Sequence, residues 1–310
     1  MVPSNESEPS QIAGSLPVPT PVYPAPHQSP AGNRLVRGLD ALLHGRLPYR
    51  FQTTMDRFLA SIGVPYKRVR LKQYQVLVRR NTWDENATAR IITNQDYTPT
   101  GHEIQPTDTV IDIGANIGCF ALVAAELASK GRVIAFEPNL DNFNLLTRNI
   151  ELNGFANVIV ERSAVSGTPG TLKLFRGTQS PLHTTIPSRL DDSAEAEEVP
   201  ATTLQQIMDK YKVERCGFLK MNCEGAEYAI LYNTPPEYLR RIDRITLEYH
   251  ATEEKERVSR ELARFLTQQG FKIFEFSDFV GFDCGFIRAT RDRLLTVAAA
   301  IGSGLPSLSV

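Results

Sequence analysis

The ten residues from Thr109 to Gly118, TVIDIGANIG, constrain the fold of this 310-residue chain more than any other stretch. β-Branched residues lead into Asp112, and Gly114 and Gly118 then bracket a tight turn. An apolar, alanine-rich run over 119–128 follows and predicts a helix. A strand, a glycine turn and a helix N-terminus form the unit that holds a nucleotide-like ligand in an open α/β sheet. Because Gly114 has no Cβ, its backbone can pass close to a ligand.

The residues around this turn distinguish between cofactors. A dinucleotide-binding fingerprint has glycine where this chain has Asn116, which disfavours a nicotinamide oxidoreductase. Asp112 would repel a pyrophosphate but would accept a hydrogen bond from an ammonium group. Glu137 ends the next apolar strand, where an acid that binds a ribose belongs. Two acids beside one glycine turn favour an adenosyl cofactor without phosphate. S-adenosylmethionine fits, since it carries an amino group and no phosphate.

Four motifs together resemble the FkbM family of S-adenosylmethionine-dependent methyltransferases over roughly residues 72–290. They are DIGANIG, FEPN at 136–139, LKMNCEGAE at 219–227 and LEYH at 247–250. The resemblance implies a Rossmann-like, seven-stranded sheet that is mostly parallel with an antiparallel last strand. It also implies O-methylation of a sugar, glycolipid or secondary-metabolite hydroxyl. The family usually has Asp where this chain has Asn222, so one anionic ligand is missing and we expect no metal.

The cofactor-binding residues are expected along the first strands. Beside the residues of the glycine turn and Glu137, the FEPN motif adds Asn139. Ser163 and Ala164 are small residues at a strand end and either border the adenine or simply end the strand. The full set is Asp112, Gly114, Asn116, Gly118, Glu137, Asn139, Ser163 and Ala164.

Methyl transfer to a hydroxyl needs alignment of the reacting atoms and a base for the hydroxyl proton. His250 is the first candidate, because a histidine of ordinary pKa, ~6.5, is largely neutral at physiological pH. The alternative is a strand-end histidine bonded to backbone. Glu248 and Glu224 are expected beside it as further catalytic residues, and His183 is the second candidate base. Glu227 is expected to serve only the helix N-terminus.

Composition divides the chain into four segments. Residues 1–33 hold eight of the twenty prolines and are expected to be a disordered leader. A basic helical and β extension follows over 34–104, then a Rossmann-like methyltransferase domain over 105–290 and a C-terminal tail over 291–310. In the extension, 69–78 predicts a strand and 87–94 a short helix. Alternating strands and helices are expected at 109–113, 118–129, 132–136, 139–153, 157–161, 204–211, 217–221, 244–247 and 253–268, with an antiparallel pair at 271–276 and 285–289. A long loop over 166–203, with an extra strand at 171–175, is expected to contact substrate.

Charge is distributed unevenly, although the net charge is only −1. Residues 34–80 contain eleven Lys or Arg and two acids, so their balance is +9 and the remainder carries −10. The basic segment fits an anionic partner, such as a membrane surface or a phosphorylated substrate, or it docks on its own acidic domain or on a second subunit of a homodimer. The alternative function is a cofactor-binding scaffold that acts through this segment with little catalysis, and its motive is Asn222 in place of the family's usual aspartate. Nucleic-acid binding is not expected, because no aromatic-rich basic motif is present.

The chain shows no signal of export. Its four cysteines have no C-x-x-C spacing, and no signal peptide or membrane-spanning apolar run is recognised. A cytoplasmic location is therefore expected.

Overall fold

The computed structural model describes Phe58 and residues 60–176, 183–184, 196–250, 255–279 and 284–291. Contacts within the chain define two units, residues 1–46 and 47–310, and every described residue belongs to the second. The predicted leader, the first part of the predicted extension over 34–57 and the C-terminal tail beyond residue 291 lie outside the described residues. The described part of the predicted extension, residues 60–104, lies in the same unit as the predicted methyltransferase domain.

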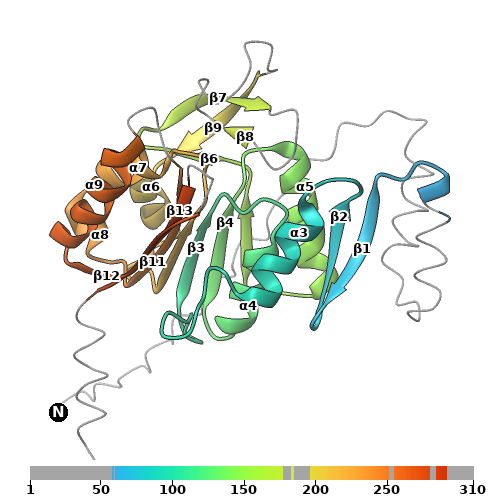
Figure 1. The fold of residues 1–310 in the computed structure, drawn as a ribbon, viewed down its shortest axis with the longest axis horizontal. Coiled ribbons are helices and arrows are strands. Elements are labelled where there is room, and N and C mark those ends of the chain that lie inside the picture. The colour runs from blue at the N-terminus through green and yellow to red at the C-terminus, as the bar shows by residue number, and fades with distance from the viewer. Residues whose placement is uncertain are drawn as a thin grey trace, which may run out of the picture. The chain divides into compact units, whose positions relative to one another are not determined.

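A seven-stranded sheet forms the centre of this unit (Figure 1), with the strand order β12-β13-β11-β10-β3-β4-β5. The strands are β3 (Thr109–Ile113), β4 (Arg132–Phe136), β5 (Val158–Glu161), β10 (Phe218–Met221), β11 (Arg244–His250), β12 (Phe271–Asp278) and β13 (Cys284–Arg291). The pairs from β11 through β5 are parallel, whereas β13 runs antiparallel to both β11 and β12. The predicted Rossmann-like sheet with an antiparallel last strand is confirmed.

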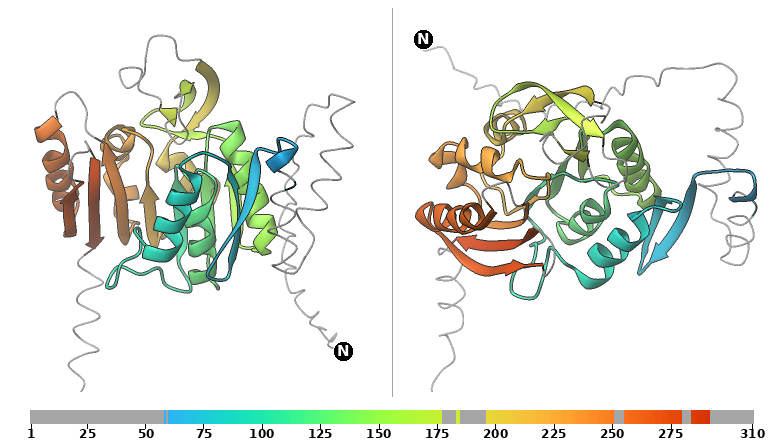
Figure 2. Two further views of the ribbon diagram at one scale, coloured as in Figure 1. Left: turned by 45° about the vertical axis from the view of Figure 1, so that its right-hand side comes forward. Right: turned by 45° about the horizontal axis from the view of Figure 1, so that its top comes forward.

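Helices cover both faces of the sheet, because strands such as β3 and β4 are apolar on both sides. They are α4 (Cys119–Leu127), α5 (Leu140–Asn153), α6 (Leu204–Lys210), α7 (Glu227–Tyr232), α8 (Pro236–Leu239) and α9 (Lys255–Gln268). Ile111 and Ile113 share one hydrophobic core with residues of α6, α7, α8 and α9. On the other face, Phe120 of α4 packs against Phe218 of β10. Figure 2 shows α6–α9 gathered around β10–β13 and α4 and α5 beside β3–β5.

Local signals account for the limits of α5. The side chain of Asn139 accepts hydrogen bonds from the backbone N–H groups of Asp141 and Asn142, which caps the helix N-terminus. Gly154 ends the helix in the left-handed conformation, with φ +71°. The predicted helix over 139–153 is confirmed to within one residue.

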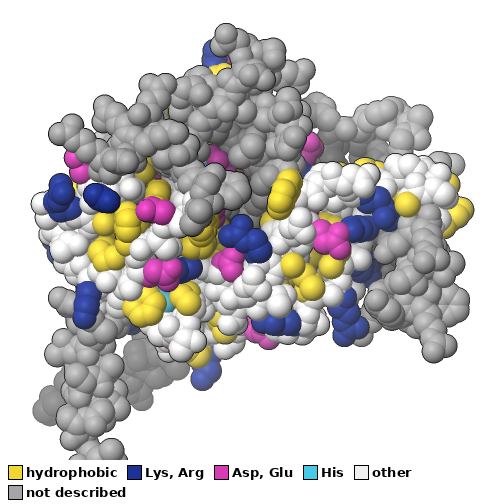
Figure 3. Space-filling view, in the orientation of Figure 1, with side chains coloured by type: hydrophobic (Ala, Val, Ile, Leu, Met, Phe, Trp, Pro, Cys, Tyr) yellow, Lys and Arg dark blue, Asp and Glu magenta, His cyan; other side chains and the backbone are white. Residues whose placement is uncertain are grey.

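The extension folds differently from the prediction. The single strand predicted over 69–78 is a hairpin of β1 (Tyr66–Leu71) and β2 (Tyr74–Arg79), which reverses at Lys72 with φ +51°. The predicted helix over 87–94 is an α-helix, α3 (Asp84–Ala89), followed by a π-helix, η1 (Arg90–Asn94). Arg79 pairs with Asp84, and Lys67 with Glu85, so part of the positive charge is neutralised within the extension itself. Figure 3 shows basic and acidic side chains interspersed over the visible face.

The predicted long loop over 166–203 contributes three of the four strands of a second sheet, and the first strand lies just before it. Its strands are β6 (Ala164–Val165), β7 (Gly170–Arg176), β8 (His183–Thr184) and β9 (Ala196–Thr202), in the order β6-β9-β7-β8. The extra strand at 171–175 is confirmed as β7. The prediction missed β9 because this strand buries only Val199 and has no alternating apolar pattern. None of the helices in the described part of the chain is long and apolar enough to cross a membrane.

Candidate active site

The predicted site residues meet at one edge of the sheet. This edge is formed by the carboxyl ends of β3, β4, β10 and β11. These strands are parallel and adjacent, with Asp112 in register with Lys220 and Met221 in register with Leu247. Residues that follow or end each strand therefore meet. They are Asp112, Glu137, Asn222, Glu224, Glu248 and His250.

The glycine turn is shaped by neighbouring protein atoms. Gly114 has φ +75°, and a Cβ placed on it would lie 1.8 Å from the backbone oxygen of Asn222. Gly118 has φ +91°, and its Cβ would lie 2.7 Å from Cδ1 of Leu146 in α5. The end of β10 therefore approaches Gly114 closely, and the predicted approach of a ligand there stays a prediction. A side chain at either position would push apart elements that form the turn.

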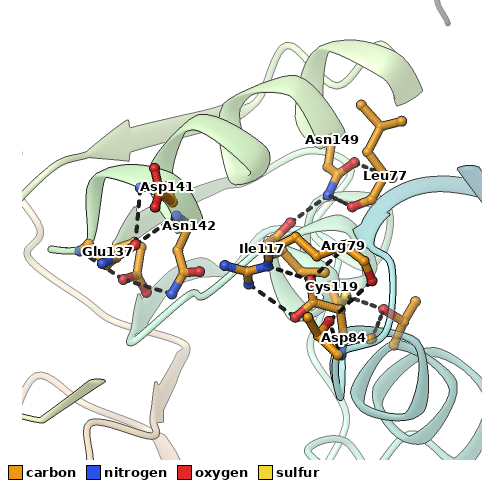
Figure 4. A network of polar contacts seen from close by, with 12 residues as sticks. Leu77, Arg79, Asp84, Ile117, Cys119, Glu137, Asp141, Asn142 and Asn149 are labelled. Atoms are coloured by element: carbon orange, nitrogen blue, oxygen red, sulfur yellow. Dashed lines mark hydrogen bonds and ion pairs between the residues drawn. The ribbon is translucent and has the colours of Figure 1, made fainter. Parts of the chain in front are cut away.

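Glu137 ties the turn to the start of α5, where Asn142 lies beside it (Figure 4). Its Oε2 accepts a hydrogen bond from the backbone N–H of Asn116 at 2.8 Å. Its Oε1 accepts one from the N–H of Asn139 at 2.9 Å and one from the amide of Asn142 at 3.4 Å. Burial raises the pKa of Glu137, and these donors oppose the rise. Since a carboxylate oxygen accepts about two hydrogen bonds, Oε2 retains capacity for a ribose hydroxyl.

Asp112 faces an ammonium group, but that group belongs to the protein. Nζ of Lys220 lies 2.9 Å from Oδ1 of Asp112 and donates a hydrogen bond to the oxygen of Gly114 at 2.7 Å. Both side chains are buried, and Nζ lies over the ring of Tyr97. Burial raises the pKa of Asp112, and Lys220 opposes the rise. Lys220 is not among the site residues predicted from the sequence, although a lysine inside the apolar run 217–221 is a signal.

Tyr97, Asn222 and Glu248 form the next group along the edge. The hydroxyl of Tyr97 donates to Oε2 of Glu248 at 3.0 Å, and the amide of Asn222 donates to the same oxygen at 3.0 Å. The Asn222 amide also donates to the Tyr97 hydroxyl at 2.9 Å. Burial, and then the charge of Glu248, hold the pKa of Tyr97 well above its ordinary value, so the phenol stays a donor. Asn222 therefore has a role that an aspartate could not fill, because a carboxylate has no hydrogen to donate.

His250 lies between two carboxylates. Its Nδ1 is 3.3 Å from Oε1 of Glu227, and its Nε2 is 3.6 Å from Oε2 of Glu224. Burial lowers the pKa of His250, but Glu227 foremost, then Glu224 and Glu248, outweigh it and raise the pKa to about 9. The sequence analysis took His250 as a neutral base. In this environment it is an imidazolium at neutral pH, because the negative neighbours stabilise the bound proton.

Glu227 does more than stabilise a helix N-terminus. It is fully buried and accepts hydrogen bonds from the N–H groups of Cys223 at 2.8 Å and Gly225 at 2.9 Å. These bonds hold the loop on which Glu224 adopts φ +57°. The charge of His250 and these donors keep the pKa of Glu227 below its ordinary value although burial opposes them.

The remaining predicted residues are Ser163, Ala164 and His183. Oγ of Ser163 is 3.0 Å from the backbone oxygens of both Ala164 and Pro200, and Ala164 packs in the small core of the second sheet. Their contact with adenine stays a prediction. His183 belongs to β8, and its side chain lies outside the described residues. Within the described ranges, no three His, Cys, Asp or Glu residues gather as a metal site.

The donor set of S-adenosylmethionine fits the unpaired acceptors at this edge. Oδ2 of Asp112 and Oδ1 of Asn116, Asn142 and Asn222 are buried and accept no hydrogen bond from the described residues. Buried acceptors without donors are rare in folded proteins. An ammonium, two ribose hydroxyls and an adenine amino group are donors of the kind that these oxygens lack.

The sequence matches the profile of the Methyltransferase FkbM domain over residues 112–273, more than half of the chain. The chain belongs to the FkbM methyltransferase family. It is 27% identical over 188 residues to the 31-O-demethyl-FK506 methyltransferase FkbM of Streptomyces tacrolimicus, which covers 52% of this chain and 72% of that protein. It is 25% identical over 179 residues to the hexuronic acid methyltransferase AglP of Haloferax volcanii, which covers 57% and 71%.

A third relative is the AMB antimetabolite synthetase AmbE of Pseudomonas aeruginosa. It is 26% identical over 219 residues, which cover 59% of this chain and 10% of the synthetase. This chain therefore spans a small part of that long protein. The family and the Rossmann-like sheet together support S-adenosylmethionine-dependent methyl transfer.

Proposed function

We propose that this protein is an S-adenosylmethionine-dependent O-methyltransferase that acts on a hydroxyl of a sugar, glycolipid or secondary metabolite. The observation that carries the proposal is the position of Glu248. Its carboxylate is fixed through Oε2 by two donors, at the same sheet edge as the glycine turn and its unpaired acceptors. Its other oxygen, Oε1, has no hydrogen-bond partner among the described residues.

The cofactor would be held by the glycine turn and the ends of β3 and β4. S-adenosylmethionine would supply an electrophilic methyl carbon on a sulfonium. Glu137 would accept a ribose hydroxyl through Oε2, and Oδ2 of Asp112 would accept from the ammonium. Because Oδ1 of Asp112 is paired with Lys220, the two oxygens of one carboxylate would serve the protein and the cofactor separately.

Glu248 replaces His250 as the base in this proposal. A hydroxyl is a poor nucleophile until its proton moves to a nearby base. The raised pKa of His250 leaves it without a lone pair to accept that proton at neutral pH. Oε1 of Glu248 is available, while Tyr97 and Asn222 fix its orientation. The imidazolium of His250, with the carboxylates of Glu224 and Glu227 beside it, would then shape the acceptor side.

The charges at this edge favour an uncharged acceptor. Five carboxylates lie there with two cations, and both cations are paired with carboxylates. The carboxylates are Asp112, Glu137, Glu224, Glu227 and Glu248. A hydroxyl of a neutral sugar or metabolite meets less repulsion there than a phosphate would. One relative is named for a 31-O position, so an oxygen acceptor occurs among the relatives' names.

Calorimetric titration with S-adenosylmethionine tests the cofactor assignment. We expect the wild type to bind it and not to bind NAD⁺. Glu137→Gln should weaken binding, because it removes the ionised acceptor at the turn. Glu151→Gln, on the exposed side of α5, is the matched control and should not change the affinity. A natively folded wild type that binds no S-adenosylmethionine would refute the proposal.

Release of S-adenosylhomocysteine with a panel of neutral polyhydroxylated acceptors tests the reaction. For an acceptor that is turned over, Glu248→Gln should slow methyl transfer by about 10²–10⁴-fold, the range for loss of a general base. A Glu248→Gln enzyme with unchanged turnover would exclude Glu248 as the base.

The alternative function, a cofactor-binding scaffold with little catalysis, is less well supported by the structure than by the sequence. It was based on Asn222 standing where the family usually has an aspartate, yet this amide holds Glu248 in place. Asn222→Asp tests the point, because it removes the donor and adds a second negative charge beside Glu248. An active enzyme should lose rate on this substitution, whereas a scaffold would show no turnover before or after it.

A further inference from the structure

Two asparagines of α5 take the place of a missing strand along one edge of β2. Oδ1 of Asn149 accepts from the N–H of Leu77 at 2.7 Å, and its Nδ2 donates to the oxygen of Leu77 at 3.2 Å. Asn153 makes the same pair of bonds with Gln75, at 2.9 and 2.7 Å. The spacing matches, because four residues of helix rise about 6 Å and two residues of strand about 6.7 Å. β1 occupies the other edge of β2.

Asn149 differs from Asn153 in one bond. Its Nδ2 also donates to the backbone oxygen of Ile117 at 2.8 Å, inside the glycine turn (Figure 4). The second donation of Asn153 stays within α5, to the oxygen of Asn149 at 2.8 Å. Asn149 is fully buried. One amide therefore contacts both the hairpin and the turn, and the other contacts the hairpin alone.

The turn needs such external support. Asn116 and Gly118 flank Ile117 and both have positive φ, +52° and +91°. A non-glycine residue in the left-handed region costs free energy and persists only where surrounding contacts fix it. Glu137 holds the N–H of Asn116, and Asn149 holds the oxygen of Ile117. A buried oxygen without its donor would favour rearrangement of the turn.

We propose that Asn149 is a positioning residue for the cofactor site: it fixes the glycine turn against the hairpin β1–β2, so that the hairpin supports cofactor binding. The part of this proposal that concerns the cofactor rests on the proposed function. The hairpin lies before the predicted methyltransferase domain, yet its backbone shares the Asn149 amide with the turn.

The test compares Asn149→Ala with Asn153→Ala. Each variant removes two bonds to β2, but only the first removes the bond to the turn. Hydrogen exchange of the Asn116 and Gly118 amides in the free protein is the first readout, since both amides are bonded within the site. We expect Asn149→Ala to speed their exchange about tenfold, and Asn153→Ala to change it less than about twofold.

The second readout is the dissociation constant of S-adenosylmethionine by calorimetry. Asn149→Ala should weaken binding about tenfold, and Asn153→Ala should leave it within about twofold. Equal effects of the two variants on exchange and on binding would overturn the proposal, since the amide would then act only on stability. If the wild type binds no S-adenosylmethionine but the exchange rates differ as expected, the proposed function fails and the positioning role stands.

Two more conservative variants test the proposal if Asn149→Ala does not fold. Asn149→Asp keeps the acceptor for the N–H of Leu77 and loses both donations, and Asn153→Asp is its control. If Asn149→Ala does not fold, faster exchange of the turn amides in Asn149→Asp than in Asn153→Asp supports the proposal. Equal exchange in these two variants overturns it.

Discussion

The protonation of His250 gives the sharpest prediction, because it decides which group can act as a base. The imidazole lies 3.3 Å from Glu227 and 3.6 Å from Glu224, and it is buried. Burial by itself would lower its pKa, and the carboxylates raise it to about 9. The unfolded chain should titrate at the ordinary value of ~6.5.

The sign of the pH dependence follows from these two values. The folded state binds the proton more tightly, so the stabilisation is fully present below pH ~6.5 and is lost as the pH rises through about 9. A difference of about 2.5 pKa units at 1.36 kcal/mol each corresponds to about 3 kcal/mol of unfolding free energy.

Urea unfolding of the wild type and of His250→Gln, each measured from pH 6 to pH 9.5, tests this value. The wild type should lose about 3 kcal/mol more than the variant across that window. The thiols of the unfolded chain also titrate there, but they are common to both proteins and cancel in the difference. Parallel curves for the two proteins, or an imidazole that titrates near pH 6.5 by NMR in the folded wild type, would refute the reasoning. Histidine could then serve as the base after all.

Three further perturbations test the packing of the site. Gly114→Ala should lower the free energy of unfolding in urea by at least about 3 kcal/mol, because its Cβ would lie 1.8 Å from a backbone oxygen. The control Gly154→Ala, at φ +71° with open space around it, should lower it by about 1 kcal/mol. Equal losses of stability would contradict the close approach. Lys220→Met should cost about 3–5 kcal/mol because it leaves Asp112 charged and buried, and adding Asp112→Asn should recover part of that loss. A double variant no more stable than the single one would argue against the pair. Burial lowers the pKa of His102 to about 4. The free energy of unfolding of the wild type should therefore fall by about 3 kcal/mol more than that of His102→Gln as the pH drops from ~6.5 to 4. The same pH dependence in the two proteins would place His102 in water.

Local sequence determined the central elements. The apolar runs at 109–113 and 132–136 gave strands with the predicted limits, and Asn139 and Gly154 marked the ends of α5. Their signals act over a few residues, through side-chain periodicity, caps and backbone freedom. The grouping of acids at one edge was also predictable, because parallel strands place their carboxyl ends together. The strand β9 was not, since its pairing partners rather than its own pattern make it a strand.

Only the tertiary structure decided what each site residue contacts. The sequence places Asp112 before a glycine turn, but the fold supplies Lys220 from more than a hundred residues away. It likewise places His250 at a strand end, and only burial between two carboxylates makes it a cation. The glycine at position 114 indicates a turn, but only the fold shows that the backbone oxygen of Asn222 lies where its Cβ would be. Burial and charge at a point depend on every element packed around it, and no local pattern records them.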